Sequence, residues 1–277
     1  MASTPIDNSA FVPTASVGPQ EPKRSFLFRF FQKHRHALND WMAGFSRIPN
    51  SPVMDPRAFE WTAELSRHAD VIREEAMAIY RHRDAIPPLK ELSPDHHGIA
   101  TDDSWRSFFL IGYGQRIAEN IARAPRTTAL VERIPGLNSA FFSILAPGAV
   151  IPRHRGVTKA FITAHLGLKV PRDAANCTME VDDQRVQWRE GEWVVFDDTY
   201  EHEVWNNTGE TRIILLCQVA RPLRMPGSWL ARAIMAYVRA SPFVRDATRN
   251  LVGWEEAFKR AEGNVPVAGR GQACGQG

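Results

Sequence analysis

Residues 192–219, EWVVFDDTYEHEVWNNTGETRIILLCQV, contain three short apolar runs separated by turn residues. Earlier runs of the same kind begin at about residue 138 and read SAFFSIL, FITAHLGLKV, CTMEV and RVQW. Short runs rich in β-branched and aromatic residues and bounded by turn residues are typical of β-strands. Many short strands at such spacing indicate a sandwich or barrel, and a double-sheet jelly roll is a common way to close one. We therefore predict a jelly-roll core over residues 138–222.

Helical patterns flank this core, so we predict an α+β chain with helices and strands segregated along the sequence. In residues 55–83 apolar side chains recur at helical spacing, with Asp55 as N-cap and Pro56 at the first helical position. The stretch SWRSFFLIGYG at 104–114 looks extended. The expected segments are a disordered tail over 1–22, a helical region packed on the core over 23–137, the jelly-roll core over 138–222, C-terminal helices over 223–262 and a disordered tail over 263–277.

The composition is that of an ordinary globular protein. Hydrophobic residues make up 44% of the 277 positions and charged residues 23%, which allows a sizeable core. A net charge of +3 gives no support for nucleic-acid binding. The three cysteines show no metal-binding or disulfide spacing, which favours a reducing compartment. No apolar stretch reaches the roughly 18 residues of a membrane span, and the first residues lack the pattern of a secretory signal. We therefore expect a cytoplasmic protein.

Residues 23–45, KRSFLFRFFQKHRHALNDWMAGF, mix aromatic and aliphatic residues with Lys, Arg and His. One interpretation is an amphipathic helix docked on the domain. The other is a basic amphipathic helix that lies on an anionic membrane surface, which would make the protein peripheral at the inner membrane. The sequence leaves both interpretations open.

Three of the nine histidines, His154, His165 and His202, fall within the predicted strands. The interior of a barrel brings inward-facing side chains from distant strands together, and imidazole is a ligand for Fe, Zn, Cu and Ni. A lone histidine near a strand is usually structural, but the trio favours a metal site. Asp197 and Asp198 precede His202 by five and four residues. They either cap a turn, or one of them orients a ligand histidine through its other ring nitrogen.

Strand alternation separates polar from apolar side chains in two of the predicted strands. In FITAHLGL, Thr163, His165 and Gly167 share one face, which can line a polar cavity, and aliphatic residues share the other. In TRIILLCQV, Arg212 begins an otherwise buried face. A buried arginine should have an anionic partner, because an unpaired buried charge is expensive. That partner is either a protein carboxylate or the carboxylate of a ligand, and the planar guanidinium suits bidentate binding of both.

Three segments carry a resemblance to a known family. They read SILAPGAVIPRHRG, HLGLKVP and WREGEWVVFDDTYEHEVWNNTGETRIIL and lie within residues 143–222. Through them the chain is identified as a member of the aspartyl/asparaginyl β-hydroxylases, which are Fe(II)- and 2-oxoglutarate-dependent oxygenases on a double-stranded β-helix, a jelly roll. The separation of His154 from His165 and the arginine ten residues after His202 agree with this family.

The resemblance implies that His154 and His202 are the catalytic residues and the ligands of the Fe(II). In most enzymes of this chemistry a carboxylate completes a facial triad with two histidines. The family resembled here keeps the histidines and has a glycine at the carboxylate position, which Gly156 occupies in this chain. 2-Oxoglutarate would then chelate the metal and leave room for O₂ and water. A site with His165 as a third ligand stays an alternative.

The resemblance also implies the cosubstrate contacts. Arg212 should bind the distal carboxylate of 2-oxoglutarate, and Ser143 and His165 match further positions that contact the cosubstrate. Thr163 is a departure, because the animal enzymes have an arginine there that also contacts the cosubstrate. Either the cosubstrate pose differs slightly in this chain, or Arg212 carries more of the binding.

The implied reaction is hydroxylation of an unactivated C–H bond, with O₂ consumed and succinate and CO₂ released. The family name favours the β-carbon of an aspartyl or asparaginyl residue or a related amino acid. The segments VIREEA, SWRSFFLIGYG, RIPGLNSAFF and RPL resemble instead a bacterial branch that hydroxylates acyl chains of membrane lipids, of the lipid A or ornithine-lipid type. A small metabolite, a halogenase that uses the position left by Gly156, and a jelly-roll binding module without catalysis are less favoured alternatives.

Overall fold

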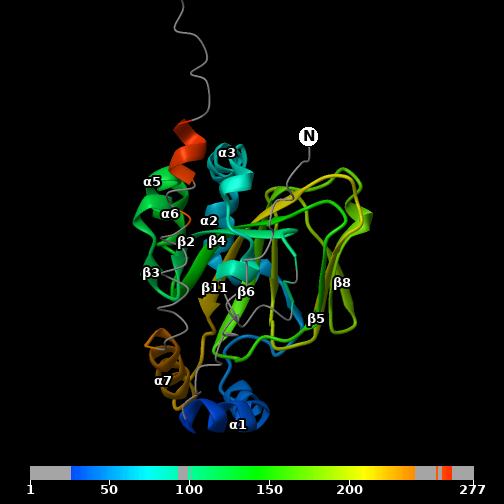
Figure 1. The fold of residues 1–277 in the computed structure, drawn as a ribbon. Helices are drawn as coiled ribbons and strands as arrows, with labels where there is room; N and C mark the ends of the chain where they lie inside the picture. The colour runs from blue at the N-terminus through cyan, green and yellow to red at the C-terminus, as the bar shows by residue number, and fades with distance from the viewer. Residues whose placement is uncertain (1–25, 93–98, 101, 241–253, 255–257, 264–277) are drawn as a thin grey trace, which may run out of the picture. The chain divides into compact units, whose positions relative to one another are not determined.

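Two antiparallel β-sheets form the centre of the structure, a computed structural model that describes residues 26–92, 99–100, 102–240, 254 and 258–263 (Figure 1). The larger sheet has the strand order β1-β9-β6-β11-β4-β2-β3, and the smaller has the order β5-β10-β7-β8. From β4 onward the chain passes back and forth between the sheets, as in a jelly roll. The predicted α+β jelly-roll core is confirmed.

The larger sheet consists of β1 (Val53–Met54), β2 (Trp105–Gly112), β3 (Gln115–Arg116), β4 (Leu137–Leu145), β6 (Phe161–Lys169), β9 (Trp193–Phe196) and β11 (Arg212–Ala220). The smaller sheet consists of β5 (Val150–His154), β7 (Cys177–Val181), β8 (Gln184–Gln187) and β10 (His202–Asn206). The α-helices are α1 (Phe26–Ala43), α2 (Glu60–Ser66), α3 (Ala69–Tyr80), α4 (Leu89–Leu92), α5 (Ala118–Arg123), α6 (Pro125–Val131) and α7 (Gly227–Arg239). Short 3₁₀ turns lie at η1 (Pro56–Ala58), η2 (Arg83–Ala85) and η4 (Ala174–Asn176).

Two regions of the sequence depart from the expected segment boundaries. The larger sheet includes β1, β2 and β3, which lie inside the 23–137 range expected to be helical, so the sheet extends beyond residues 138–222. The extended stretch predicted at 104–114 is β2.

Asp55 caps a 3₁₀ turn, η1, by accepting from the amide of Arg57 at 2.9 Å. The expected tails lie outside the described residues, except that Gly263 ends a helical stretch at 258–263.

The chain divides into two compact units, residues 1–35 and 36–277, and the boundary falls within α1. Both sheets and all later helices belong to the second unit. The predicted helix in residues 23–45 is present as α1, whose described part begins at Phe26. No helix among the described residues is long and apolar enough to cross a membrane.

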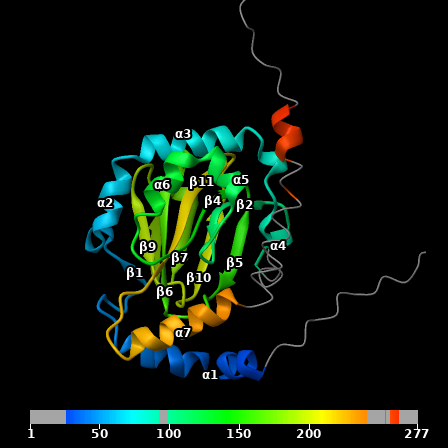
Figure 2. The ribbon, with the colours of Figure 1, turned by 90° about the vertical axis from the view of Figure 1, so that its left-hand side faces the viewer.

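The larger sheet separates two hydrophobic clusters. One lies between this sheet and the helices, with α3, α5 and α6 on the outer side (Figure 2). The aliphatic face of β6, which the alternation predicted to be apolar, belongs to this outer cluster. The second cluster lies between the two sheets and includes Trp188, Phe196 and Ile214. The opposite face of β6, with Thr163 and His165, therefore points toward the space between the sheets.

Gly167 allows a loop to cross closely over β6. A Cβ atom at this position would clash with the backbone carbonyl of Arg189. The amide of Gly167 donates to the carbonyl of Glu192 at 3.1 Å, and the amide of Gly191 donates to the carbonyl of Gly167 at 2.9 Å. This close approach fixes the segment after β8 against the sheet, and Trp188 at the start of that segment becomes fully buried.

Candidate active site

His154 and His202 come together because their strands pair. His154 is the last residue of β5, His202 is the first of β10, and the two are register partners in the smaller sheet. Cross-strand partners carry their side chains on the same face, about 5 Å apart. The centroids of the two imidazole rings are 4.0 Å apart. The sequence separates these histidines by 48 positions, and the fold places them side by side.

Backbone carbonyls orient both imidazoles. The Nδ1 atom of His154 lies 2.8 Å from the carbonyl oxygen of Pro152, and Nδ1 of His202 lies 3.0 Å from that of Tyr200. A carbonyl oxygen can only accept, so in the neutral rings Nδ1 carries the proton and Nε2 keeps its lone pair. The interpretation that Asp197 or Asp198 orients a ligand histidine is therefore wrong.

The surroundings keep both rings neutral at neutral pH. Burial lowers the pKa of His154, partly offset by its hydrogen bond to the Pro152 carbonyl. Burial, followed by repulsion from His154, lowers the pKa of His202 to about 4. A neutral imidazole with a free Nε2 is the form that binds a metal ion.

The pair fits a single metal ion. A metal–imidazole bond is about 2 Å long, so two nitrogens that share an ion lie within about 4 Å of each other. Ring centroids 4.0 Å apart are compatible with this limit. Among the described residues, no group of three or more His, Cys, Asp or Glu side chains could hold an ion. The alternative of a three-histidine site with His165 is thus wrong for the described part of the chain.

The space beside Gly156 is already taken by Asp198. A Cβ atom on Gly156 would clash with the Asp198 carboxylate, and the Gly156 amide donates to the Asp198 carbonyl at 2.6 Å. A carboxylate-bearing residue at position 156 would therefore not fit without displacing the Asp198 carboxylate. The Asp198 carboxylate also accepts from the hydroxyl of Thr163 at 3.0 Å. Burial, then the neighbouring Asp197, raises the pKa of Asp198 to about 6.

Arg212 lies in the interior with few partners. Arg212 is 1% exposed, and burial lowers the pKa of its guanidinium to about 10. Nη2 donates to the hydroxyl of Ser143 at a long 3.4 Å, while Nε and Nη1 have no hydrogen-bond partner among the described residues. A protein carboxylate, one of the two partners expected from the sequence, is not found at Arg212 within the described residues. The carboxylate of a ligand stays the other candidate partner.

Other unpartnered polar atoms gather around Arg212. The guanidinium lies 4.5 Å from the ring centroid of Trp188, whose indole N–H has no partner in the described chain. His165 is buried, and the centroid of its ring lies 6.1 Å from that of Trp188. Neither ring nitrogen of His165 has a hydrogen-bond partner among the described residues. The hydroxyl of Ser107, the register partner of Ser143, is likewise buried and unpartnered among the described side chains. Buried polar groups normally have partners, so this group of donors indicates a binding site for a polar ligand.

Sequence reasoning found Arg212, Ser143 and His165 in this group but missed Trp188 and Ser107. Ser143 also accepts from the indole N–H of Trp105 at 3.0 Å. The sequence gives no direct signal for Trp188, because its position depends on the loop that crosses Gly167. Ser107 could have been found from the strand alternation of β2, had its register with β4 been known.

Asp197 is the centre of a buried ion cluster. Its carboxylate accepts from the Lys159 ammonium at 2.5 Å and from the Arg221 guanidinium, and all three side chains are almost fully buried. The amide and hydroxyl of Thr199 also donate to it, at 3.0 and 2.6 Å. The predicted turn cap is thus confirmed, but Asp197 additionally neutralises two buried cations. The cluster holds the loop that leads to His202.

We expect Asp197→Asn to lower the free energy of unfolding by about 3–5 kcal/mol, because it leaves two buried cations without a counter-charge. Urea denaturation followed by circular dichroism measures this loss. Asp183→Asn, an exposed aspartate in the turn between β7 and β8, is the matched control and should change stability by less than about 0.5 kcal/mol. A loss below about 1 kcal/mol for Asp197→Asn would contradict the role of the cluster.

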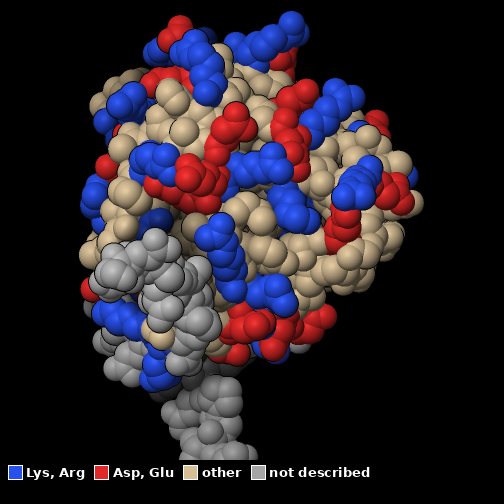
Figure 3. All heavy atoms as spheres, turned by 90° about the horizontal axis from the view of Figure 1, so that it is seen from above, with Lys and Arg blue, Asp and Glu red and all other residues tan. Residues whose placement is uncertain are grey.

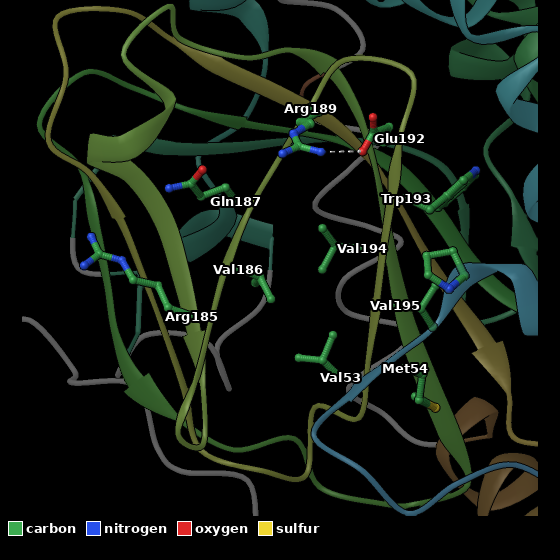
Figure 4. A pocket seen from close by; sticks show the side chains of 11 residues that line it. Val53, Met54, Arg185, Val186, Gln187, Arg189, Glu192, Trp193, Val194 and Val195 are labelled. Carbon is green, nitrogen blue, oxygen red and sulfur yellow. Dashed lines mark ion pairs between the residues drawn. The ribbon is translucent and has the colours of Figure 1, made fainter.

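A separate cavity of about 370 Å³ opens between β8 and the edge formed by β1 and β9 (Figure 4). Val53, Val186 and Val194 point into it, and Arg189 forms an ion pair with Glu192 at its rim at 3.6 Å. None of the paired histidines, Arg212 or the unpartnered donors lines this cavity. It is therefore distinct from the candidate active site.

The sequence matches one protein family and several named relatives. Residues 66–222 match the family described as aspartyl/asparaginyl beta-hydroxylase. The ornithine lipid ester-linked acyl 2-hydroxylase of Rhizobium tropici is 34% identical over 262 residues, which cover 93% of each chain. The aspartyl/asparaginyl beta-hydroxylase of Homo sapiens is 28% identical over 205 residues, which cover 70% of this chain and 26% of that protein. Among solved structures, a cupin domain of an XRE family transcriptional regulator from Enterobacter cloacae is 17% identical, covering 30% of this chain and 82% of that chain, with a TM-score of 0.26.

Proposed function

Because this chain belongs to the aspartyl/asparaginyl β-hydroxylase family, we propose that it is an Fe(II)- and 2-oxoglutarate-dependent hydroxylase. The observation that carries the proposal is the buried guanidinium of Arg212, which lacks a protein carboxylate among the described residues, in the same jelly-roll core as a pair of adjacent histidines. A ligand that both chelates a metal and presents a second carboxylate suits this combination, and 2-oxoglutarate is such a ligand.

Each residue of the site has a defined task in this proposal. His154 and His202 would hold the ion through their Nε2 atoms, since their Nδ1 atoms bind backbone carbonyls. Arg212 would bind the distal carboxylate, and Ser143 would add a hydroxyl contact beside it. The bound iron and 2-oxoglutarate would supply the activation of O₂, with one oxygen atom entering the substrate C–H bond and the other leaving in succinate as CO₂ is released.

The remaining contacts orient the site and exclude water. Phe196 packs against the rings of both His165 and His202, with centroid distances of 5.0 and 5.4 Å. This apolar wall strengthens the electrostatic contacts that a bound carboxylate would make with Arg212. Thr163 stands where the sequence resemblance implies an arginine in the animal enzymes, and its hydroxyl donates to Asp198. Arg212 would therefore carry the carboxylate binding without a second arginine from β6.

For the substrate, we propose an acyl chain of a membrane lipid. The support is the acyl 2-hydroxylase of Rhizobium tropici, which aligns with this chain over 93% of both lengths. The aspartyl or asparaginyl β-carbon, which the sequence slightly favoured, stays a second candidate because of the family match and the human relative. The whole-length alignment favours the lipid, since the human protein is matched over only about a quarter of its length, 26%.

The test is the mass of the product. The full chain is incubated with Fe(II), ascorbate and 2-oxoglutarate, together with either bacterial lipid extract or aspartyl- and asparaginyl-containing peptides. The proposal predicts a gain of one oxygen atom in a lipid acyl chain, with stoichiometric succinate and no product when 2-oxoglutarate is omitted. A gain in the peptide pool alone would replace the lipid by the second candidate. No succinate with either pool would contradict the proposed activity.

A further inference from the structure

Exposed apolar side chains gather in one region of the second unit. Among the described residues, five large hydrophobic side chains are exposed: Trp41 at 44%, Val150 at 45%, Val157 at 64%, Met225 at 52% and Trp229 at 60%. Scattered single residues of this kind are normal on a protein surface. Four of these five, all except Val150, lie around the C-terminal end of α1, and this clustering calls for an explanation.

Two sets of contacts bring the segments that carry these side chains to the C-terminal end of α1. The side chain of Asn39 in α1 donates to the carbonyl of Val157 at 3.3 Å and accepts from the amide of Lys159 at 2.9 Å. At the other end, the Phe45 carbonyl accepts from the amide of Arg224 at 2.8 Å. Trp41 packs against Phe45 with a centroid distance of 4.7 Å, so it lies between the two contact points.

Met225 and Trp229 lie on either side of the contact between the start of α7 and Phe45. Gly227 packs so closely on Phe45 that a Cβ atom at Gly227 would lie 2.7 Å from the Phe45 Cβ. Met225 precedes this contact by two residues, and Trp229 follows it by two along the helix. We call the region at the C-terminal end of α1 that carries Trp41, Val157, Met225 and Trp229 the tryptophan face.

Three exposed arginines near the tryptophan face have no carboxylate partner among the described residues. Arg47, Arg224 and Arg232 are exposed there and form no ion pair with another described residue, and Asp40 is the acidic residue beside Trp41. The face above α3 differs, because blue and red side chains are mixed on it (Figure 3). Arginines of the helical layer pair with glutamates, for example Arg126 with Glu74 at 2.8 Å and Arg133 with Glu64 at 3.0 Å.

The tryptophan face is also next to the candidate active site. Val157 is three residues after His154, and Lys159 is part of the buried ion cluster that holds the loop before His202. A flat partner that covered the tryptophan face would therefore lie close to the segment that carries the first candidate metal ligand.

We propose that the tryptophan face rests on the surface of an anionic phospholipid membrane. Tryptophan favours the membrane–water interface, where its apolar ring and its N–H group are both accommodated. Arginines without carboxylate partners are attracted to anionic lipid headgroups. The inference rests on the proposed function in one respect, because the membrane would supply the lipid substrate. Its physical support is the exposed surface.

The test is cosedimentation of the full chain with vesicles in the presence of EDTA, so that catalysis plays no part. Vesicles of phosphatidylcholine with one quarter phosphatidylglycerol should bind the protein, and vesicles of phosphatidylcholine alone should bind it much less. The double variant Trp41→Ser/Trp229→Ser should lower the partition coefficient at least about tenfold, because burying one large apolar side chain has an effect of this size. Arg224→Gln/Arg232→Gln should give a similar loss on the anionic vesicles.

Two control variants separate this surface from general effects. Val150→Ser removes the exposed apolar residue at the opposite end of β5 from His154, and Arg133→Gln removes an arginine paired with Glu64. Both should bind like the unaltered protein, and unchanged melting temperatures show that the tryptophan variants fold. Equal binding by the double tryptophan variant, or no binding of the unaltered protein to anionic vesicles, would overturn the inference. Vesicle binding without lipid hydroxylation would instead remove the proposed substrate and leave the membrane surface standing.

Discussion

Replacing either His154 or His202 with alanine is expected to abolish the conversion of 2-oxoglutarate to succinate. The two rings are cross-strand neighbours, and no third protein ligand stands beside them among the described residues. When a metal ion has only two protein ligands, removal of one leaves a single protein ligand to hold it. Loss of an outer hydrogen-bond partner of a metal ligand already costs about 10–100-fold in affinity or activity, so loss of a ligand should exceed about 100-fold.

Succinate formation and Fe(II) binding, measured separately, check this expectation. His68→Ala is the matched control, because His68 is exposed at the start of α3 and its side chain makes no capping bond. It should keep full activity and metal affinity. Substantial turnover by either His154→Ala or His202→Ala would mean that the metal is held elsewhere.

The second large effect is expected from Arg212→Met, which should raise the concentration of 2-oxoglutarate needed for half-saturation by about 30- to 4000-fold. This range corresponds to the 2–5 kcal/mol that a buried, hydrogen-bonded charge pair typically contributes when one partner is truncated. The proposed iron ligands His154 and His202 are untouched, so Fe(II) binding should be retained. Titration of 2-oxoglutarate against succinate formation measures the change.

Stability separates this binding role from a structural one. Arg212 is buried with its Nε and Nη1 unpartnered in the described chain, so Arg212→Met should leave the free energy of unfolding unchanged or raise it in the absence of 2-oxoglutarate. Arg221→Met is the contrasting control, because Arg221 is buried against Asp197 and its loss should lower stability by about 3–5 kcal/mol. A destabilised Arg212→Met with normal 2-oxoglutarate affinity would assign Arg212 to the fold.

The sequence contained enough to predict the jelly roll and the residues at its centre. Strand-length apolar runs, alternation in β6, and the resemblance over residues 143–222 pointed to His154, His202 and Arg212, and the fold places the two histidines in contact. The apolar runs are local features of the sequence. The position of side chains on one face of a strand follows from the alternation of polar and apolar residues. The binding roles of His154, His202 and Arg212 remain proposals.

Other features depended on long-range geometry that no local pattern encodes. The burial of Trp188 follows from a loop that crosses Gly167, and the pairing of Asp197 with Lys159 and Arg221 joins three separate segments. Asp197 looked in sequence like a turn residue near a metal ligand, and only the structure shows the cations beside it. β1 and β3 were missed because each has only two residues. β2 was predicted as extended, but its pairing with β4 joins segments about 30 residues apart, and no local pattern indicates it.

The central claim is that His154 and His202 share one Fe(II) ion while Arg212 binds the far carboxylate of 2-oxoglutarate. An anomalous-difference map from crystals grown without oxygen, with Fe(II) and 2-oxoglutarate, tests it most directly. The account predicts one iron peak about 2 Å from Nε2 of both histidines, and a 2-oxoglutarate molecule whose distal carboxylate lies within hydrogen-bond distance of Arg212. An iron peak away from the histidine pair, or a cosubstrate carboxylate that does not meet Arg212, would contradict it.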